Sequence, residues 1–342
     1  MTVETAILVG AGSIGKRHAK ILVERYRRLV IVDPSADSRQ WAADNLAGSV
    51  ETFEDLSDGL RAVDGALSTA VVATLGPLHR DNVSRLIGHG IRRIYCEKPL
   101  ASSVADGYFL ADLSATSGTR LVVGLQRRFS GLVDQVRTYA RDHLGGEPVS
   151  IVGHGGAQCL ITTGMHWVDL AIDIFGGFPH RVGGLGNADR MNPRGSDLDV
   201  WQGTATWEFS DDRLLTLTYS NRSSVDGFLH IYCPLGRIDV CPDGVIRAYR
   251  RIDEEVERDP RITRTGEAVE TGATVVQPPS VHPVMRALDE LESTKPLSYT
   301  TTDGARSLEC ALGALVAFDS GMAVSLPMER SSEYYTRQWA VT

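Results

Sequence analysis

The stretch Ala6-Ile7-Leu8-Val9-Gly10-Ala11-Gly12-Ser13-Ile14-Gly15 decides the fold of the first part of the chain. It places a G-x-G-x-x-G loop directly after a short apolar strand and directly before a helix predicted over 16–26, the pattern of a dinucleotide-binding turn. The glycines permit a tight turn, the approach of a pyrophosphate and the packing of helix on strand, and the helix dipole favours phosphate charge. We predict that Gly10, Gly12, Ser13, Ile14 and Gly15 bind a dinucleotide; the alternative is a tight turn without a ligand.

Strands and helices continue to alternate beyond this loop. The predicted strands cover 29–32, 65–73, 93–96 and 120–123, and the predicted helices between them cover 38–46, 77–88 and 104–117. Strand, helix and strand repeated in this way imply right-handed crossovers and a parallel sheet. We therefore predict an α/β fold in which residues 1–126 form a doubly wound dinucleotide-binding domain of the Rossmann type.

An acidic residue, Asp33, follows the second predicted strand, eighteen residues after Gly15. A carboxylate at this place accepts hydrogen bonds from the ribose hydroxyls of the cofactor and repels a 2′-phosphate, so NAD is favoured over NADP. Ser35 and Arg39 lie close by in the sequence and keep NADP open as an alternative. A surface Asp in a turn before Pro34 is the other interpretation.

The pattern changes after residue 126. Long helices are predicted over 130–144 and 164–175, with a strand over 149–153 between them, and strand-like runs follow over 201–209, 214–220 and 228–238. Consecutive strands joined by short turns are typical of an antiparallel meander. We predict that residues 127–342 form a second, α+β domain with a mainly antiparallel sheet.

Composition restricts the class of protein. The formal net charge of −8 and the absence of a basic stripe argue against a nucleic-acid partner. The longest apolar runs are too short to cross a membrane, and the first residues lack the pattern of a signal peptide. Five widely spaced cysteines indicate buried thiols in the cytoplasm, and no cluster suggests a metal site. We expect a soluble cytoplasmic protein.

A lysine follows the predicted strand 93–96, in Glu97-Lys98-Pro99, so it lies at the carboxyl end of a parallel strand, where open α/β sheets bind ligands. Together with the glycine loop and the run Ala73-Thr74-Leu75-Gly76-Pro77-Leu78-His79, this motif resembles the glucose-fructose oxidoreductase, inositol dehydrogenase and rhizopine-catabolism (Gfo/Idh/MocA) family. The resemblance covers nearly the whole chain. It implies a Rossmann domain followed by an open-faced sheet domain, with assembly as a homodimer or homotetramer.

The resemblance also implies roles for single residues. Lys98 is similar to the family residue that contacts the reacting hydroxyl and moves its proton, and a partly dry cleft would lower its pKa toward neutrality. The remaining residues predicted to contact the cofactor at these strand ends are Thr74, His79, Glu97 and Lys98 itself. An exposed lysine at a strand end is the alternative for Lys98.

A second constellation lies on the predicted helix 164–175, where His166, Asp169 and Asp173 fall on one polar stripe. A lone histidine on such a helix is more often a hydrogen-bonded core residue. A histidine followed three residues later by Asp resembles the catalytic segment of the family, however, which implies that His166 is catalytic and that Asp169 binds substrate or orients His166. The family commonly has Asp four residues before this histidine, and here Thr162 takes that place, which suggests another substrate or a variant mechanism.

Arg128, in the run after the last Rossmann strand, is a candidate for holding a substrate phosphate or carboxylate; salt bridges between domains are the alternative. The expected activity is NAD(P)-dependent hydride transfer to or from a hydroxyl carbon of a sugar, a sugar derivative or a cyclitol. Two alternatives stay open. One is a glycoside hydrolase that works by transient oxidation with tightly held NAD, and the other is a cofactor-binding regulator without catalysis.

Overall fold

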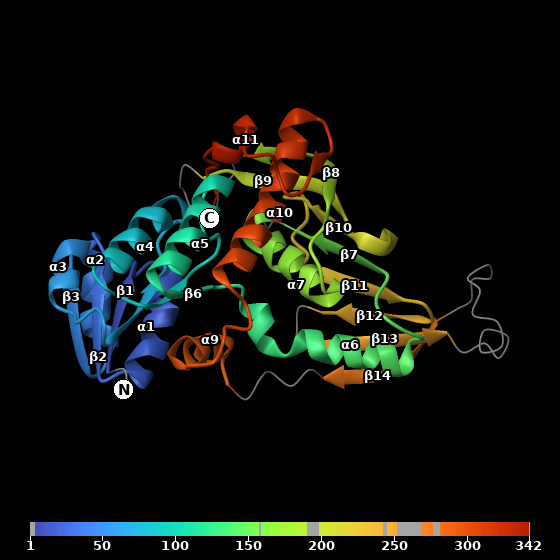
Figure 1. The fold of residues 1–342 in the computed structure, drawn as a ribbon. Coiled ribbons are helices and arrows are strands. Elements are labelled where there is room, and N and C mark those ends of the chain that lie inside the picture. The colour runs from blue at the N-terminus through green and yellow to red at the C-terminus, as the bar shows by residue number, and fades with distance from the viewer. Residues whose placement is uncertain are drawn as a thin grey trace. The chain divides into compact units, whose positions relative to one another are not determined.

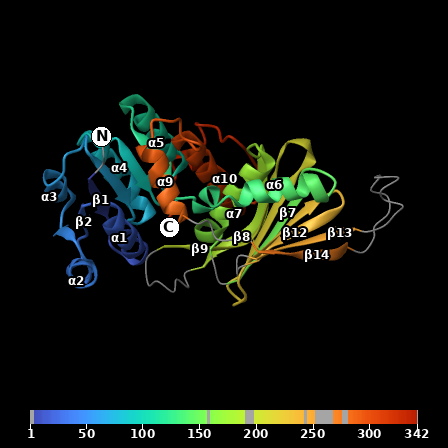
Figure 2. The same cartoon turned by 90° about the horizontal axis from the view of Figure 1, so that it is seen from below.

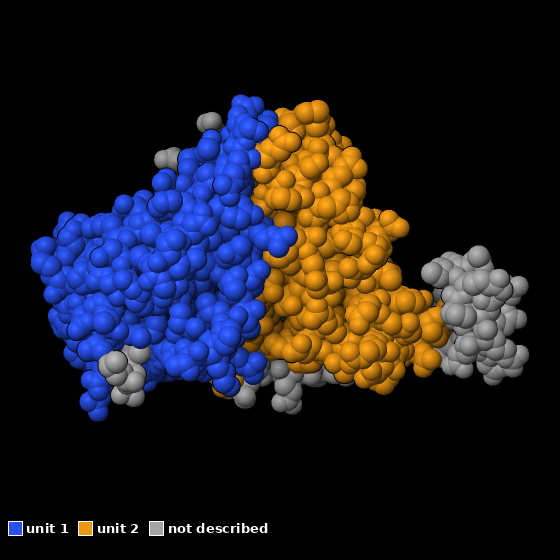
Figure 3. Space-filling model, viewed as in Figure 1, with its two compact units in different colours: residues 1–125, 284–308, 330–342 blue, residues 126–283, 309–329 orange. Residues whose placement is uncertain are grey.

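The computed structural model describes residues 4–156, 159–189, 198–241, 245–251, 268–275 and 281–341 (Figure 1). The chain divides into two compact units (Figure 3). The first contains residues 1–125, 284–308 and 330–342, and the second contains residues 126–283 and 309–329. The first break falls one residue before the predicted boundary. Residues 284–308 and 330–342, predicted as part of the second domain, belong instead to the first unit.

The first unit is built on a six-stranded parallel sheet with the strand order β3-β2-β1-β4-β5-β6. Its strands are β1 (Thr5–Val9), β2 (Arg28–Val32), β3 (Ser49–Phe53), β4 (Ser68–Val72), β5 (Arg93–Cys96) and β6 (Arg120–Val123). The helices between them are α1 (Ser13–Arg25), α2 (Ala36–Asn45), α3 (Leu56–Arg61), α4 (His79–Gly88) and α5 (Val104–Ser117). This is the doubly wound Rossmann sheet expected from the sequence. The carboxyl ends of β1, β4 and β5 therefore lie side by side at one edge.

The strand interiors explain why this sheet forms. All five residues of β4 are buried, as are four of the five residues in β1 and in β2. Parallel sheets covered on both faces need such continuous apolar runs. Edge strand β3 is mostly exposed, in agreement with its polar sequence.

Two later segments complete the first unit. On α9 (Pro283–Glu292), Asp289 and Glu292 form ion pairs with Arg25 at 2.7 and 2.6 Å. The segment after residue 330 packs beside α5, where the N–H of Trp339 donates to the carbonyl of Ser102 at 2.8 Å. These contacts associate residues 284–308 and 330–342 with the first unit.

The second unit contains a nine-stranded sheet with the order β14-β13-β12-β11-β7-β10-β9-β8-β15. Its strands are β7 (Ser150–Gly155), β8 (Arg181–Asp189), β9 (Val200–Glu208), β10 (Leu214–Tyr219), β11 (Phe228–Cys233), β12 (Gly236–Val240), β13 (Val245–Arg251), β14 (Ala268–Val275) and β15 (Val324–Ser325). Every strand pair is antiparallel except β7 and β10, which run parallel. The prediction of a mainly antiparallel sheet is confirmed.

One predicted strand of this sheet was wrong. The run 228–238 forms two strands, β11 and β12, which pair with each other across a turn at Pro234 and Leu235. Proline has no N–H to donate to a ladder and fixes its own φ angle, so it ends the strand there.

Helices α6 (Leu132–His143) and α7 (Met165–Phe175) lie over one face of the nine-stranded sheet (Figure 2). The strands bury alternate residues: Ile151, Gly153 and Gly155 of β7 are buried, and the residues between them are more exposed. Helix α10 (Thr301–Ser320) has residues in both units. Within the described part of the chain, none of the helices is long and apolar enough to span a membrane.

Candidate functional site

The glycine loop has the shape that a dinucleotide requires. Gly10 has a φ angle of +95°, and a Cβ atom there would lie 2.8 Å from the backbone of Ala73. A Cβ atom on Gly15 would lie 2.0 Å from the carbonyl oxygen of Gly10, so both positions exclude a side chain. Above Gly12, in contrast, a Cβ atom would meet nothing within 4 Å. The second glycine thus faces open space, as the approach of a pyrophosphate to the backbone demands.

Helix α1 begins at Ser13, immediately after this open position. Its first turn contains no acidic residue, and no side chain caps its N-terminus. The N–H groups of that turn and the positive end of the helix dipole suit a bound phosphate, and Ser13 and Ile14 are the residues that present them. The residues present fit the pyrophosphate of a dinucleotide.

Asp33 lies just after β2, and its carboxylate connects the glycine loop to the residues that follow this strand. One carboxylate oxygen accepts a hydrogen bond from the N–H of Ala11 at 2.6 Å, and the other accepts one from the N–H of Ser35 at 2.8 Å. Arg39 donates to the carbonyl oxygen of Asp33 at 2.8 Å. These two N–H groups fix the orientation of the Asp33 carboxylate beside the glycine loop.

Lys98 follows β5, in a cis peptide with Pro99, and is partly exposed. Its backbone N–H donates to Oε2 of Glu97 at 3.2 Å. Glu97 is itself buried, and its Oε1 lies 2.7 Å from Nε2 of His18 on α1. The Glu97 carboxylate therefore joins the glycine-loop helix to the lysine backbone, a contact that favours an indirect role for Glu97 toward the cofactor.

His79 is completely buried at the start of α4. Its Nδ1 lies 2.8 Å from the carbonyl oxygen of Pro99, and its Nε2 lies 3.0 Å from that of Thr74. Burial lowers the pKa of His79 below its ordinary value. Its side chain thus connects the loops after β4 and β5. Direct contact of His79 or of Thr74 with the cofactor stays a prediction.

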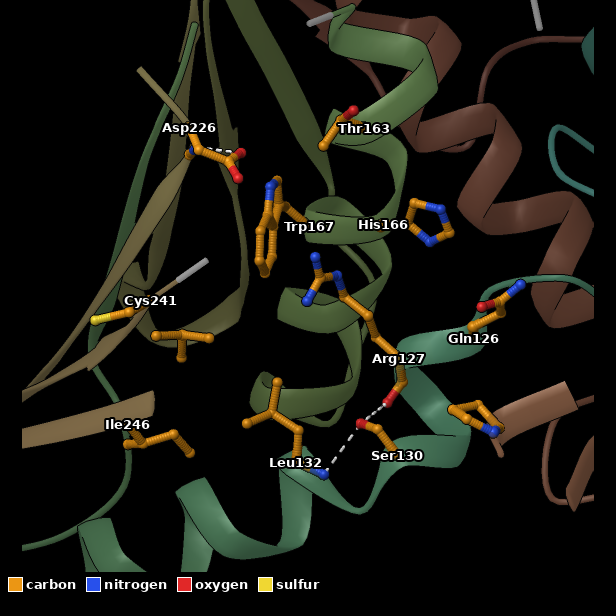
Figure 4. Close-up of a pocket in the computed structure, with 13 residues that line it drawn as sticks. Gln126, Arg127, Ser130, Leu132, Thr163, His166, Trp167, Asp226, Cys241 and Ile246 are labelled. Carbon is orange, nitrogen blue, oxygen red and sulfur yellow. Dashed lines mark hydrogen bonds between the residues drawn. The ribbon is translucent and has the colours of Figure 1, made fainter. Parts of the chain in front are cut away.

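The second unit contains a cavity of about 460 Å³ (Figure 4). Its polar part includes His166 and Thr163, and an apolar part is formed by Leu132 and Ile246. The remaining lining residues are Gln126, Arg127, Ser130, Trp167, Asp226, Gly227, Val240, Cys241 and Pro283. A volume of this size suits a small organic ligand, and a mixture of apolar walls and a few polar groups is usual for such sites.

His166 lies in the first turn of α7, as the sequence predicted, and lines this cavity. The turn before α7 is a π-helix (Leu160–Gly164), and such turns occur often at functional sites. Thr162, which takes the place of the family Asp, lies in this turn but is not among the residues that line the cavity. Its neighbour Thr163 lines it instead.

Asp169 and Arg128 form an ion pair inside the second unit. Nε of Arg128 donates to both carboxylate oxygens of Asp169, at 3.0 and 2.8 Å, and Nη1 lies 3.4 Å from Asp173. The Asp169 side chain is 1% exposed. The polar stripe predicted for this helix is therefore real, and two of its acids meet Arg128. The roles of Asp169 and Arg128 in substrate binding stay predictions.

The prediction named Arg128, and the structure places the adjacent Arg127 in the cavity instead. Arg127 lines the cavity, and its guanidinium lies 3.7 Å from the centroid of the Trp167 ring. Both arginines follow the last Rossmann strand, and the register that selects one of them depends on the turn over Gln126–Ser130. No group of metal-ligating side chains occurs in the ranges that the structure describes.

Residues 5–125 match the model of the oxidoreductase family with an NAD-binding Rossmann fold, Gfo/Idh/MocA. The chain is 30% identical over 156 residues to the inositol 2-dehydrogenase/D-chiro-inositol 3-dehydrogenase of Shouchella clausii, covering 44% of each. It spans less than half of the length of the curated relatives it matches.

The fold is shared over nearly the whole chain. An oxidoreductase from Agrobacterium radiobacter, solved with NAD+, L-tartaric acid and magnesium, has a TM-score of 0.73 and 16% identity, with 95% of this chain and 98% of that one covered. The myo-inositol 2-dehydrogenase of Lactobacillus plantarum has a TM-score of 0.71 and 17% identity, with 94% and 99% covered. The segment that matches the family model, residues 5–125, is the one that forms the parallel sheet and the glycine loop, and this part of the chain is similar to the Gfo/Idh/MocA oxidoreductases.

Proposed function

We propose that this chain is an NAD-dependent oxidoreductase that transfers a hydride between nicotinamide and a carbinol or keto carbon of a sugar, a sugar derivative or a cyclitol. The observation that carries the proposal is the arrangement of three features at one edge of the parallel sheet. There the open position above Gly12, the anchored carboxylate of Asp33 and the lysine after β5 follow the ends of β1, β2 and β5. Relatives named as inositol dehydrogenases support the substrate class.

Bound NAD would supply the hydride acceptor. The first turn of α1 would hold its pyrophosphate, and Asp33 would accept hydrogen bonds from the adenosine ribose hydroxyls. The same carboxylate disfavours the 2′-phosphate of NADP, although Arg39 beside it could contact such a group. Glu97 would act by holding the backbone of Lys98.

Lys98 and His166 would handle the proton of the reacting hydroxyl. An amine at the end of β5 can accept that proton from the hydroxyl oxygen as the hydride leaves the carbon that bears it. An imidazole can then pass the proton on to solvent. We further propose that Asp169 and Arg128 contribute to substrate binding as the ion pair described above, and that Thr162 contributes through its turn, since Thr163 beside it lines the cavity.

The proposal is tested by titrating the purified protein with NADH and NADPH, followed by fluorescence, and then by measuring reduced nicotinamide with a panel of sugars, sugar acids and inositols. Micromolar binding of NADH and turnover of any panel member support the dehydrogenase. Tight binding without turnover contradicts it and favours the regulator. Release of an aglycone with NAD that stays bound during gel filtration favours the hydrolase.

We also propose a cytoplasmic protein that assembles as a homodimer or homotetramer. All five cysteines are buried thiols, which agrees with a reducing compartment. Light scattering on the purified protein measures the number of subunits directly.

A further inference from the structure

Arg127 lines the cavity of the second unit, and its contacts differ from those of the adjacent Arg128. The guanidinium of Arg128 meets two carboxylates, those of Asp169 and Asp173. Among the residues that the structure describes, no carboxylate forms an ion pair with Arg127, and its guanidinium lies against the Trp167 ring instead. The described part of the chain therefore supplies no ion-pair partner for this charge.

Two other groups near Arg127, Asp226 and Tyr219, form no ion pair with it in the described part of the chain. Asp226 also lines the cavity, but it acts on Arg127 only through space, and its carboxylate accepts the N–H of Gly227 at 2.8 Å. Burial raises the pKa of Tyr219 above its ordinary value, so the phenol stays neutral. Burial lowers the pKa of Arg127 below its ordinary value, as expected for a charge that loses water without gaining an ion pair. A guanidinium keeps its proton at neutral pH even so.

The geometry of the contact with Trp167 restricts what can bind. The guanidinium lies over the indole, with Cζ 3.7 Å from the ring centroid. Its N–H groups are the donors available to a ligand, and their fork matches the two oxygens of a carboxylate. Figure 4 shows the guanidinium of Arg127 beside the ring of Trp167, with His166 projecting from the other side of α7.

We infer that the substrate carries a carboxylate, which Arg127 binds through the edge of its guanidinium while Trp167 holds the guanidinium plane. The inference rests on the proposed function, because that proposal assigns the same cavity to the reacting hydroxyl through His166. A cavity of about 460 Å³ has room for a single sugar ring with an acid group. The chemical class is therefore a polyhydroxy acid, such as a hexuronate, and not a neutral polyol.

Matched pairs of probes test this inference. Isothermal titration of the NADH complex with D-glucuronate and D-glucose, and with D-galacturonate and D-galactose, compares ligands that differ only in the carboxylate. We expect each acid to bind at least about 10-fold more tightly than its neutral partner, since hydrogen bonds to charged groups contribute strongly. Arg127→Gln should abolish this preference, and Arg127→Lys should keep part of it. Arg141→Gln, at an exposed residue of α6, is the matched control.

Equal binding of acid and neutral probes overturns the inference, as does an acid preference that survives Arg127→Gln. D-glucose 6-phosphate is the third arm, and a preference for it over glucuronate contradicts the assignment of a carboxylate. These outcomes are separate from failure of the proposed function, which shows itself as lack of NADH binding or of turnover. Binding of the acids is measurable with the free protein even if hydride transfer is absent.

Discussion

Nε2 of His18 lies 2.7 Å from Oε1 of Glu97, and the side chains are only 3% and 8% exposed. The pair joins α1, which begins at the glycine loop, to the residue before Lys98, whose N–H the same carboxylate accepts. Removal of the imidazole would take this contact away from a buried carboxylate.

We therefore expect His18→Ala to lower the free energy of unfolding by about 1 to 3 kcal/mol, the typical effect of removing a hydrogen-bond partner from a buried group. Urea denaturation followed by circular dichroism measures this change. His180→Ala is the control, because His180 is 60% exposed and 3.8 Å from its acid, and it should change stability by less than about 0.5 kcal/mol. Equal losses of stability in the two variants would show that the buried contact of His18 with Glu97 stabilises the protein no more than the exposed contact of His180 does.

Lys98→Met should lower kcat by about 10² to 10⁴ on any substrate found, because the side chain is proposed to move the hydroxyl proton. The dissociation constant of NADH should stay within about 3-fold, since the pyrophosphate and ribose contacts are made elsewhere. Lys20→Met, on the exposed side of α1, is the matched control. Turnover within a few-fold of the wild type with normal NADH binding would falsify the role of Lys98.

Asp33→Asn should shift the cofactor preference toward NADP by at least about 10-fold in the ratio of kcat/KM values. The substitution removes the negative charge that disfavours a 2′-phosphate and keeps an oxygen for the N–H groups of Ala11 or Ser35. Steady-state kinetics with both cofactors measure the ratio. Asp37→Asn, an exposed position in the first turn of α2, should leave it unchanged. An unaltered ratio in the Asp33 variant refutes the ribose assignment.

Arg128→Met should destabilise the protein by about 3 to 5 kcal/mol, because it removes the guanidinium that contacts the buried Asp169 carboxylate, and Asp169→Leu should cost less, because Arg128 keeps Asp173 at 3.4 Å. The double variant should be more stable than the sum of the single effects predicts, by at least about 1 kcal/mol. Additive effects in this double-mutant cycle would mean that the two side chains are not energetically coupled. Urea denaturation of the four proteins gives the values.

His79 makes stability depend on pH. Its folded-state pKa lies below the ordinary value of 6.5, so the unfolded chain binds a proton more readily than the folded one. The contribution of the neutral imidazole is therefore complete above about pH 7 and is lost as pH falls from 6.5 through the folded pKa. His79→Gln should flatten the decrease in thermal midpoint between about pH 7 and 5. Parallel profiles for variant and wild type would argue against this assignment.

The fold of the first unit could be predicted closely from the sequence, because the motifs that indicate it are local in the chain. The glycine loop, the apolar strands and the acid after β2 lie within one short βαβ segment, where spacing alone sets their geometry. Edge strand β3 and the short α3 escaped prediction because their residues are mostly polar, which is expected where a sheet ends.

The second unit was harder to predict in detail. His166 and Asp169 were found because helical periodicity places them on one stripe of α7. Which arginine reaches the cavity could not be found in this way, because a single turn after Leu125 sends Arg127 to Trp167 and Arg128 to Asp169. The lining residues from β12 and β13 come from distant parts of the chain, and no periodicity links them to α7.

The contacts of α9 and of the segment after residue 330 with the first unit have a consequence for biosynthesis. As the chain leaves the ribosome, residues 1–125 emerge first, yet Asp289, Glu292 and Trp339 follow only after most of the second unit has been translated. Residues 1–125 cannot make these contacts during their own synthesis, and the groups involved stay exposed to water and to chaperones until the later segments arrive. A fragment cut at residue 125 would never make them, so the first unit is a product of the chain's late segments as well as of its early ones.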